Sequence, residues 1–137
     1  MSAAVVFSWP MRVYLEDTDA GGVVYYANYL RFLERCRTEW LRTRGYSQKS
    51  LAREKEILFM VLNVNIDYRS PARLDDSLVV TCDPQPDGRT AIIFKQKIFR
   101  NNLESEESLK LLVEAQVRVV CVDAKSLRPR RISEYIL

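Results

Sequence analysis

The sequence predicts a two-layer α+β domain in which one long helix packs against an antiparallel sheet of about five strands. Residues 24–45 carry apolar side chains at the period of an α-helix. One segment before this stretch and four after it alternate apolar and polar residues, as half-buried strands do. The last four segments are joined by short connections, which favour antiparallel neighbours. Because the helix must bury its apolar stripe against the sheet, two layers are expected.

Composition supports one globular domain that spans residues 1–137. The chain has 47% apolar and 28% charged residues, which are ordinary values for a soluble protein. No apolar run approaches the roughly 20 residues of a membrane span, and the sequence has no internal repeat or linker. The first residues lack the basic and apolar regions of a signal peptide, so we expect a cytoplasmic protein.

The first predicted strand, residues 9–16, leads into an acidic loop. Its apolar side carries Trp9, Met11, Val13 and Leu15, and its polar side carries Arg12, Tyr14 and Glu16. Pro10 lies near the start of the strand, where a missing N–H donor is tolerated.

The predicted helix has a wide aromatic stripe and a polar opposite face. The stripe contains Tyr25, Tyr29, Phe32, Leu33, Cys36 and Trp40. The opposite face carries Ala27, Arg31, Glu34, Thr38 and Arg42. Gly45 is a natural C-terminal stop, and residues 46–56 predict a short helix or a lid-like connection.

Four strands are predicted after the helix. They cover residues 62–68, 77–83, 89–99 and 109–123, with turns at 71–76, 84–88 and 101–102. The second face of such an apolar sheet also needs cover, which favours a homo-oligomer.

The chain contains no histidine, and this restricts the chemistry more than any other count. It excludes Ser-His-Asp and Cys-His nucleophile systems and histidine-ligated metal sites. The three cysteines, Cys36, Cys82 and Cys121, lie far apart in apolar patterns and predict buried free thiols. An enzyme with this composition must use carboxylates, hydroxyls and backbone N–H groups.

The net charge of +3 is too small to indicate a nucleic-acid partner. The basic residues are interleaved with acidic ones, except at Arg128-Pro129-Arg130-Arg131, which remains a candidate contact for an acidic partner. Arg89, after a Pro-Asp-Gly turn, is a candidate phosphate contact or an ordinary solvated side chain.

Residues 16–29 form the most informative stretch of the sequence. Glu16, Asp17 and Asp19 place three carboxylates within four residues, and Gly21-Gly22 follow them before the predicted helix begins. A carboxylate can act as a base or a nucleophile, and the N–H groups of a first helical turn can bind a developing oxyanion. Asp19 can also be a turn or N-cap residue. An Asp-x-Asp pair without other ligands is a weak metal signal, so no metal is predicted.

With these elements in place, the sequence resembles the hotdog-fold thioesterases of the 4-hydroxybenzoyl-CoA thioesterase superfamily. It is most similar to the YbgC-type acyl-CoA thioesterases associated with the bacterial Tol-Pal system. The segments that carry the resemblance are Trp9-Pro10, Arg12-Val13-Tyr14, residues 16–25, Tyr29, Arg35, Thr38-Glu39, Leu41-Arg42, residues 71–76, 120–123 and 127–130.

The resemblance implies a sheet wrapped around the central helix, working as a dimer or as a homotetramer built from two dimers. It implies an acyl-CoA or acyl carrier protein thioester as substrate. It also implies that the reaction requires no cofactor. The catalytic carboxylate would be Asp19, and the backbone N–H of Tyr26 would polarise the thioester carbonyl. Gly21, Gly22, Val23 and Tyr25 would contact substrate, and Arg89 would contact the nucleotide phosphates.

One position departs from the family pattern, since close relatives often have histidine where this chain has Tyr26. A backbone role survives that change, and a side-chain role does not. Whether Asp19 acts as general base or nucleophile is left open by the sequence. A non-catalytic hotdog module that binds acyl groups or an envelope-complex partner is the alternative, and the missing histidine disfavours a dehydratase.

Overall fold

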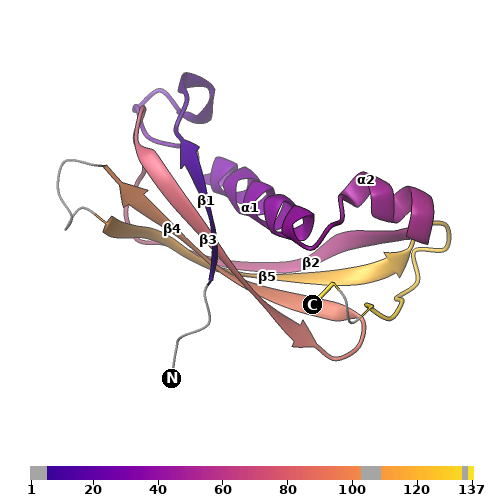
Figure 1. Ribbon diagram of the computed structural model, residues 1–137. Coiled ribbons are helices and arrows are strands. Elements are labelled where there is room, and N and C mark those ends of the chain that lie inside the picture. Colours follow the sequence, from indigo (N-terminus) through magenta and orange to yellow (C-terminus); the bar gives the residue numbers. More distant parts are fainter. Residues whose placement is uncertain (1–5, 103–108, 134–135) are drawn as a thin grey trace.

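The computed structural model describes residues 6–102, 109–133 and 136–137. Five strands wrap around one long helix, α1 (Figure 1). The elements, in chain order, are β1 (Phe7–Arg12), α1 (Tyr29–Thr43), α2 (Gln48–Ser50), β2 (Ile57–Tyr68), β3 (Ser77–Asp87), β4 (Ala91–Asn101) and β5 (Leu109–Asp123). Leu15–Asp17 and Tyr26–Asn28 are 3-10 turns, and Leu51–Lys55 is a π-helical turn that continues α2.

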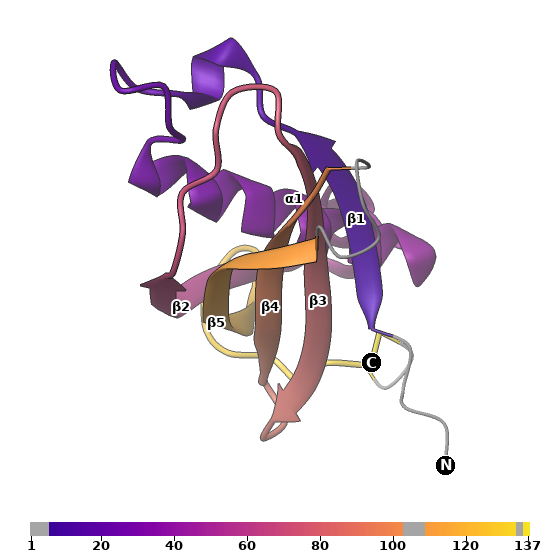
Figure 2. The ribbon, with the colours of Figure 1, turned by 90° about the vertical axis from the view of Figure 1, so that its left-hand side faces the viewer.

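The strands form one antiparallel sheet in the order β1-β3-β4-β5-β2. The sheet curves, and α1 lies in its concave side (Figures 1 and 2). The predicted two-layer α+β architecture is therefore confirmed. Because the chain passes from β1 through α1 to β2, it crosses from one edge of the sheet to the other before the remaining strands fill the centre.

The core lies between α1 and the inner face of the sheet. Alternate residues of neighbouring strands face each other there, as in the pairs Ile92 with Val119 and Phe94 with Val117. The middle of the α1 stripe is buried as the sequence predicts, and its buried members are Tyr29, Phe32, Leu33, Cys36 and Trp40. All three cysteines are free and buried, which confirms that prediction.

The first strand is shorter than the predicted 9–16 and begins earlier. β1 pairs only with β3, and the ladder ends where Arg12 faces Ser77, so the chain leaves the sheet there. Leu15 was expected on the buried side but lies in a 3-10 turn and is 73% exposed.

The helix begins at Tyr29, five residues later than predicted. Tyr25 has an extended backbone because its N–H donates to the Asp17 carbonyl (3.0 Å) and closes the acidic loop. Its side chain is exposed, so its placement in the buried stripe was wrong. Of the two alternatives predicted for 46–56, the short helix is the one observed, as α2 and the π-helical turn.

The predicted turn at 84–88 is also wrong, because β3 continues to Asp87 through Pro84 and Pro86. β1 pairs with β3 only as far as Cys82, so this end of β3 is a sheet edge that tolerates missing N–H donors. The turn is formed by residues 88–90. β4 ends at Asn101, within the predicted 101–102 turn, and residues 103–108, which follow that turn, lie outside the described residues.

A matched pair of leucines on α1 tests the core. Leu33 is fully buried and Leu30 is 41% exposed. We expect Leu33→Ala to lower the free energy of unfolding by about 2–5 kcal/mol, since it removes buried methyl groups and leaves a cavity. Leu30→Ala should change it by less than about 1 kcal/mol. Urea unfolding of both variants measures the difference, and equal losses would contradict this packing.

Candidate active site

The acidic loop between β1 and α1 folds back on itself as a short hairpin. Asp19 N–H donates to the Val23 carbonyl at 2.9 Å, and Gly22 N–H donates to the Asp19 carbonyl at 3.1 Å. The Tyr25 N–H to Asp17 bond closes the base of the hairpin. Residues 17–25 are therefore held as one unit directly before the Tyr26–Asn28 turn.

Asp17 is the structural carboxylate of the loop. It is buried, and its Oδ2 accepts the Tyr14 N–H at 2.8 Å. Its carbonyl oxygen accepts hydrogen bonds from the Tyr25 N–H and from Asn28 Nδ2. With these contacts Asp17 ties the strand end to the helix start.

Asp19 lies at the exposed tip of the hairpin. Its Oδ1 accepts the Gly21 N–H at 2.8 Å, so the turn role that the sequence left open is present. Its Oδ2 has no hydrogen-bond partner within the described residues. A methyl group added at Gly21 would lie 3.2 Å from Asp19 Oδ1, and Gly22 has φ of +79°. Gly21 thus keeps the carboxylate uncrowded, Gly22 allows the left-handed backbone of the turn, and one carboxylate oxygen is available to a ligand.

Tyr26 is the first residue of the 3-10 turn, so its N–H has no acceptor within that turn. Tyr68, at the end of β2, donates its hydroxyl to the Tyr26 carbonyl at 3.1 Å. A small cleft of about 260 Å³ lies beside this pair, bordered by Val24, Tyr29 and residues 69–71. The structure therefore brings Asp17, Asp19 and Tyr26 into one loop system with a cleft beside it.

Ala72 connects this loop to the helix and to the segment after β2. Its N–H donates to the Tyr29 hydroxyl at 2.9 Å, and its carbonyl accepts the Val24 N–H at 2.9 Å. Both Ala72 and Tyr29 are buried. Burial raises the pKa of the Tyr29 hydroxyl, although the Ala72 N–H partly opposes that effect. The hydroxyl therefore stays neutral at physiological pH.

The structure does not bring Arg89 to this loop. Arg89 lies in the exposed turn between β3 and β4, and its carbonyl accepts the Ile132 N–H. The opposite end of β3 adjoins the acidic loop through Arg12 and Ser77, roughly 35 Å away along an 11-residue strand. In the basic tail, Arg130 is bound to the Lys55 and Glu56 carbonyls.

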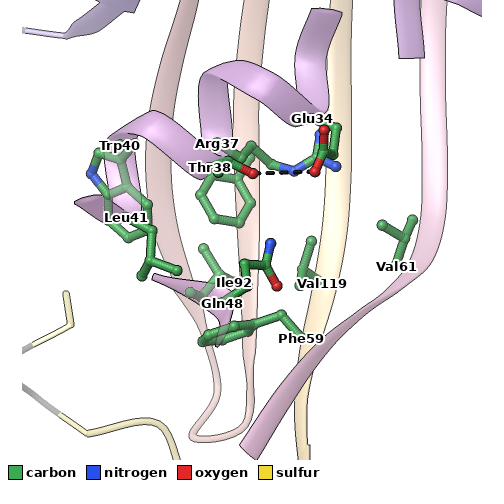
Figure 3. Close-up of a pocket in the computed structure, with 11 residues that line it drawn as sticks. Glu34, Arg37, Thr38, Trp40, Leu41, Gln48, Phe59, Val61, Ile92 and Val119 are labelled. Carbon is green, nitrogen blue, oxygen red and sulfur yellow. Dashed lines mark hydrogen bonds between the residues drawn. The ribbon is translucent and has the colours of Figure 1, made fainter. Parts of the chain in front are cut away.

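A larger cavity of about 430 Å³ lies beside the second half of α1 (Figure 3). Its lining is mostly apolar and aromatic, with polar groups along the helix. The residues that line it are Glu34, Arg37, Thr38, Trp40, Leu41, Gln48, Phe59, Val61, Ile92, Phe94 and Val119.

Sequence reasoning missed this cavity and placed Glu34 and Thr38 on the polar face opposite the aromatic stripe. They instead line the cavity, where Thr38 donates its hydroxyl to Glu34 Oε1 at 3.2 Å. The signal available in the sequence was Phe59, an aromatic residue before the predicted strand 62–68. It has meaning only once β2 is known to begin at Ile57.

The described residues contain no cluster of three or more acidic, cysteine or histidine side chains suited to a metal ion. In the same part of the chain, every helix is too short or too polar to span a bilayer.

The chain is similar to known proteins both in sequence and in structure. Residues 21–106 match the family model described as "Thioesterase superfamily". The chain is 46% identical to the acyl-CoA thioesterase YbgC of Haemophilus influenzae, over 90% of this chain and 85% of the relative. It is 45% identical to the acyl-CoA thioester hydrolase YbgC of Escherichia coli, over 96% of this chain and 93% of the relative.

Among solved structures, a 1,4-dihydroxy-2-naphthoyl-CoA thioesterase from Synechocystis superposes with a TM-score of 0.85. The match has 24% sequence identity and covers 96% of this chain and 92% of that one. At this identity the comparison concerns the fold alone, and it confirms the hotdog architecture.

A hydroxyl deletion at Tyr29 tests the connection through Ala72. We expect Tyr29→Phe to lower the free energy of unfolding by about 1–3 kcal/mol, because it leaves the buried Ala72 N–H without an acceptor. Tyr25→Phe, at an exposed side chain, should change stability by less than about 0.5 kcal/mol. Thermal and denaturant unfolding give both values, and an unaffected Tyr29→Phe would show that the Ala72 bond has no net effect.

Proposed function

The chain belongs to the thioesterase superfamily, and we propose that it hydrolyses acyl-CoA thioesters with Asp19 as the catalytic carboxylate. The free Oδ2 of Asp19, next to a turn that begins with the Tyr26 N–H, is the observation that carries this proposal. The YbgC relatives, similar along nearly the whole chain, support the substrate class. An acyl carrier protein thioester presents the same bond and is a second form of the substrate.

The Tyr26 N–H is proposed to bind the thioester oxygen. During attack on the carbonyl carbon that oxygen becomes negative, and one well-placed donor stabilises it by roughly 3–4 kcal/mol. Tyr68 supports the donor because its hydroxyl fixes the carbonyl of the same residue. A backbone donor does not depend on the side chain, so tyrosine can replace the histidine common at this position.

Asp19 has two routes to products. As a general base it takes a proton from water, and the hydroxide adds to the carbonyl carbon. As a nucleophile its oxygen adds instead and forms a mixed anhydride, which water then cleaves. In both routes the C–S bond breaks and the thiolate leaves to take a proton. Both need a carboxylate oxygen that is free to reach water or substrate, which Asp19 offers at the exposed tip of the hairpin.

The acyl group is proposed to occupy the cavity beside α1, between Phe59, Ile92 and Phe94. Its lining residues on α1 run from Glu34 to Leu41, about 7.5 to 18 Å along the helix from Tyr29. Neither Asp19 nor any other residue of the acidic loop lines this cavity in the same chain. A second copy is needed to complete the site.

The edge strand β2 is the surface proposed to bind that copy. It is 12 residues long and carries a bulge between Val61 and Asn63. Val61 is 50% and Leu62 53% exposed, which is unusual for a long unpaired edge. Antiparallel pairing of β2 with its copy about a two-fold axis reverses the direction of α1. The Asp19 end of one chain then faces the cavity end of the other.

Replacement of Asp19 by asparagine tests the catalytic assignment. We expect kcat for acyl-CoA hydrolysis to fall about 100-fold or more, since the base or nucleophile is lost. The fold should be unaffected, because an asparagine oxygen still accepts the Gly21 N–H. Thiol release from short-chain, long-chain and aroyl-CoA substrates is measured beside Glu16→Gln, an exposed carboxylate in the same loop. Near-normal turnover by Asp19→Asn would refute the assignment.

A second test concerns assembly through β2. We expect the double variant Leu62→Lys and Val64→Lys to dissociate the oligomer, because two charges would lie within the paired edge. Turnover should fall as dissociation increases. Ser8→Lys, on the opposite edge of the sheet, should leave both unchanged. Sedimentation equilibrium measures the mass, and an active wild-type monomer of 16.0 kDa would exclude a shared site.

A further inference from the structure

Arg37 is an unusual residue for the wall of an apolar cavity. It projects from α1, borders the cavity and is partly withdrawn from solvent. No ion pair formed within the described residues includes it. A guanidinium has five N–H donors and is charged at physiological pH. Partial removal of a charge from water without a carboxylate in ion-pair contact is unfavourable, so the other contacts of this guanidinium matter.

One side of the guanidinium is held by Gln96. Arg37 Nη1 donates to Gln96 Oε1 at 3.0 Å. The amide of Gln96 cannot turn, because its Nε2 donates to the Leu33 carbonyl at 3.1 Å and to the Thr81 carbonyl at 3.3 Å. Gln96 is 1% exposed. The central strand β4 therefore presents a fixed acceptor that positions Arg37.

The remaining surroundings of Arg37 include the Phe94 ring and the charge of Glu34, which acts on Arg37 without forming an ion pair. Its Cζ lies 5.9 Å from the centre of the Phe94 ring, which also lines the cavity. Burial lowers the pKa of Arg37, and the negative charge of Glu34 opposes that effect. Glu34 is exposed and accepts the Thr38 hydroxyl. Figure 3 shows Glu34, Arg37 and Thr38 along the helix side of the cavity.

We propose that Arg37 forms a polar subsite for an oxygen atom carried on the acyl group away from the thioester. This inference rests on the proposed function, since it takes the cavity as the acyl site. The guanidinium would donate to a ketone, hydroxyl or carboxylate oxygen, while Phe59, Ile92 and Val119 cover the acyl carbons. Arg37 thereby determines specificity, and Gln96 positions it.

Three isosteric substrates test the subsite. 5-Methylhexanoyl-CoA has no acyl oxygen beyond the thioester, 5-oxohexanoyl-CoA has a neutral one and glutaryl-CoA has a carboxylate in the same place. A shorter trio (4-methylpentanoyl-, 4-oxopentanoyl- and succinyl-CoA) allows for the depth of the cavity. We expect wild type to favour an oxygen-bearing member over its methyl isostere by roughly 10- to 100-fold in kcat/KM, as for a hydrogen bond to a charged group. The ketone and carboxylate arms identify which oxygen is bound.

Arg37→Met, which keeps the length of the side chain, should remove that preference. It should leave or improve turnover of the methyl isosteres. Arg35→Met is the matched control, since Arg35 is exposed on the same helix. If Arg37→Met does not fold, Arg37→Lys keeps the charge without the planar fork and should reduce the preference. Circular dichroism and thermal unfolding check each variant.

The same trios are titrated calorimetrically onto Asp19→Asn, so that binding preference is measured without hydrolysis. A binding preference that Arg37→Met removes supports the subsite, even if wild type releases no thiol and the catalytic proposal fails. Equal kcat/KM and equal affinity within both trios would overturn the subsite. So would an Arg37→Met variant that weakens all members alike, since Arg37 would then be structural.

Discussion

The position of the acidic loop depends on the buried backbone of Ala72. Its two polar groups cannot reach water, so both must be paired inside the protein. One bonds Tyr29 at the start of α1, and the other bonds Val24 at the end of the loop. A single peptide segment therefore fixes the loop relative to the helix. The exposed Asp19 can be positioned accurately because this buried connection, together with Asp17, removes the freedom of the residues around it.

The same principle applies to the segment that carries Ala72. Asp76 is buried and accepts the Arg73 N–H at 2.8 Å, and Arg100 reaches it from β4 at 3.3 Å. The Asp76 carbonyl also accepts the Val13 N–H, just after β1 ends. The loop, the end of β1 and the segment before β3 thus form one hydrogen-bonded layer at this end of the sheet. Removal of the Asp76 carboxylate would take this acceptor from both the Arg73 N–H and the Arg100 guanidinium.

Sequence patterns predicted the architecture because periodicity follows burial. The α1 stripe and the alternation in β4 and β5 are set by one core, so helix, strands and antiparallel order could be predicted. Boundaries were missed where a tertiary hydrogen bond overrides local preference, as at Tyr25, or where a free edge tolerates proline, as at Pro84 and Pro86. The residues of the acidic loop were identified from the sequence, whereas their mutual geometry and the roughly 35 Å between Arg89 and the loop required the sheet.

The sequence pattern did not predict the cavity, and the reason is more general. Helical periodicity distinguishes only a buried and a solvated face. It does not identify a flank of the helix that lies beside a curved sheet. Here β2 curves past that flank, so Glu34, Arg37 and Thr38 meet Phe59 and Val61 across an open volume. Polar residues on such a flank are neither core nor surface. Arg37 and Thr38 are partly withdrawn from water there while Glu34 stays exposed, and the open volume leaves room for a ligand beside all three.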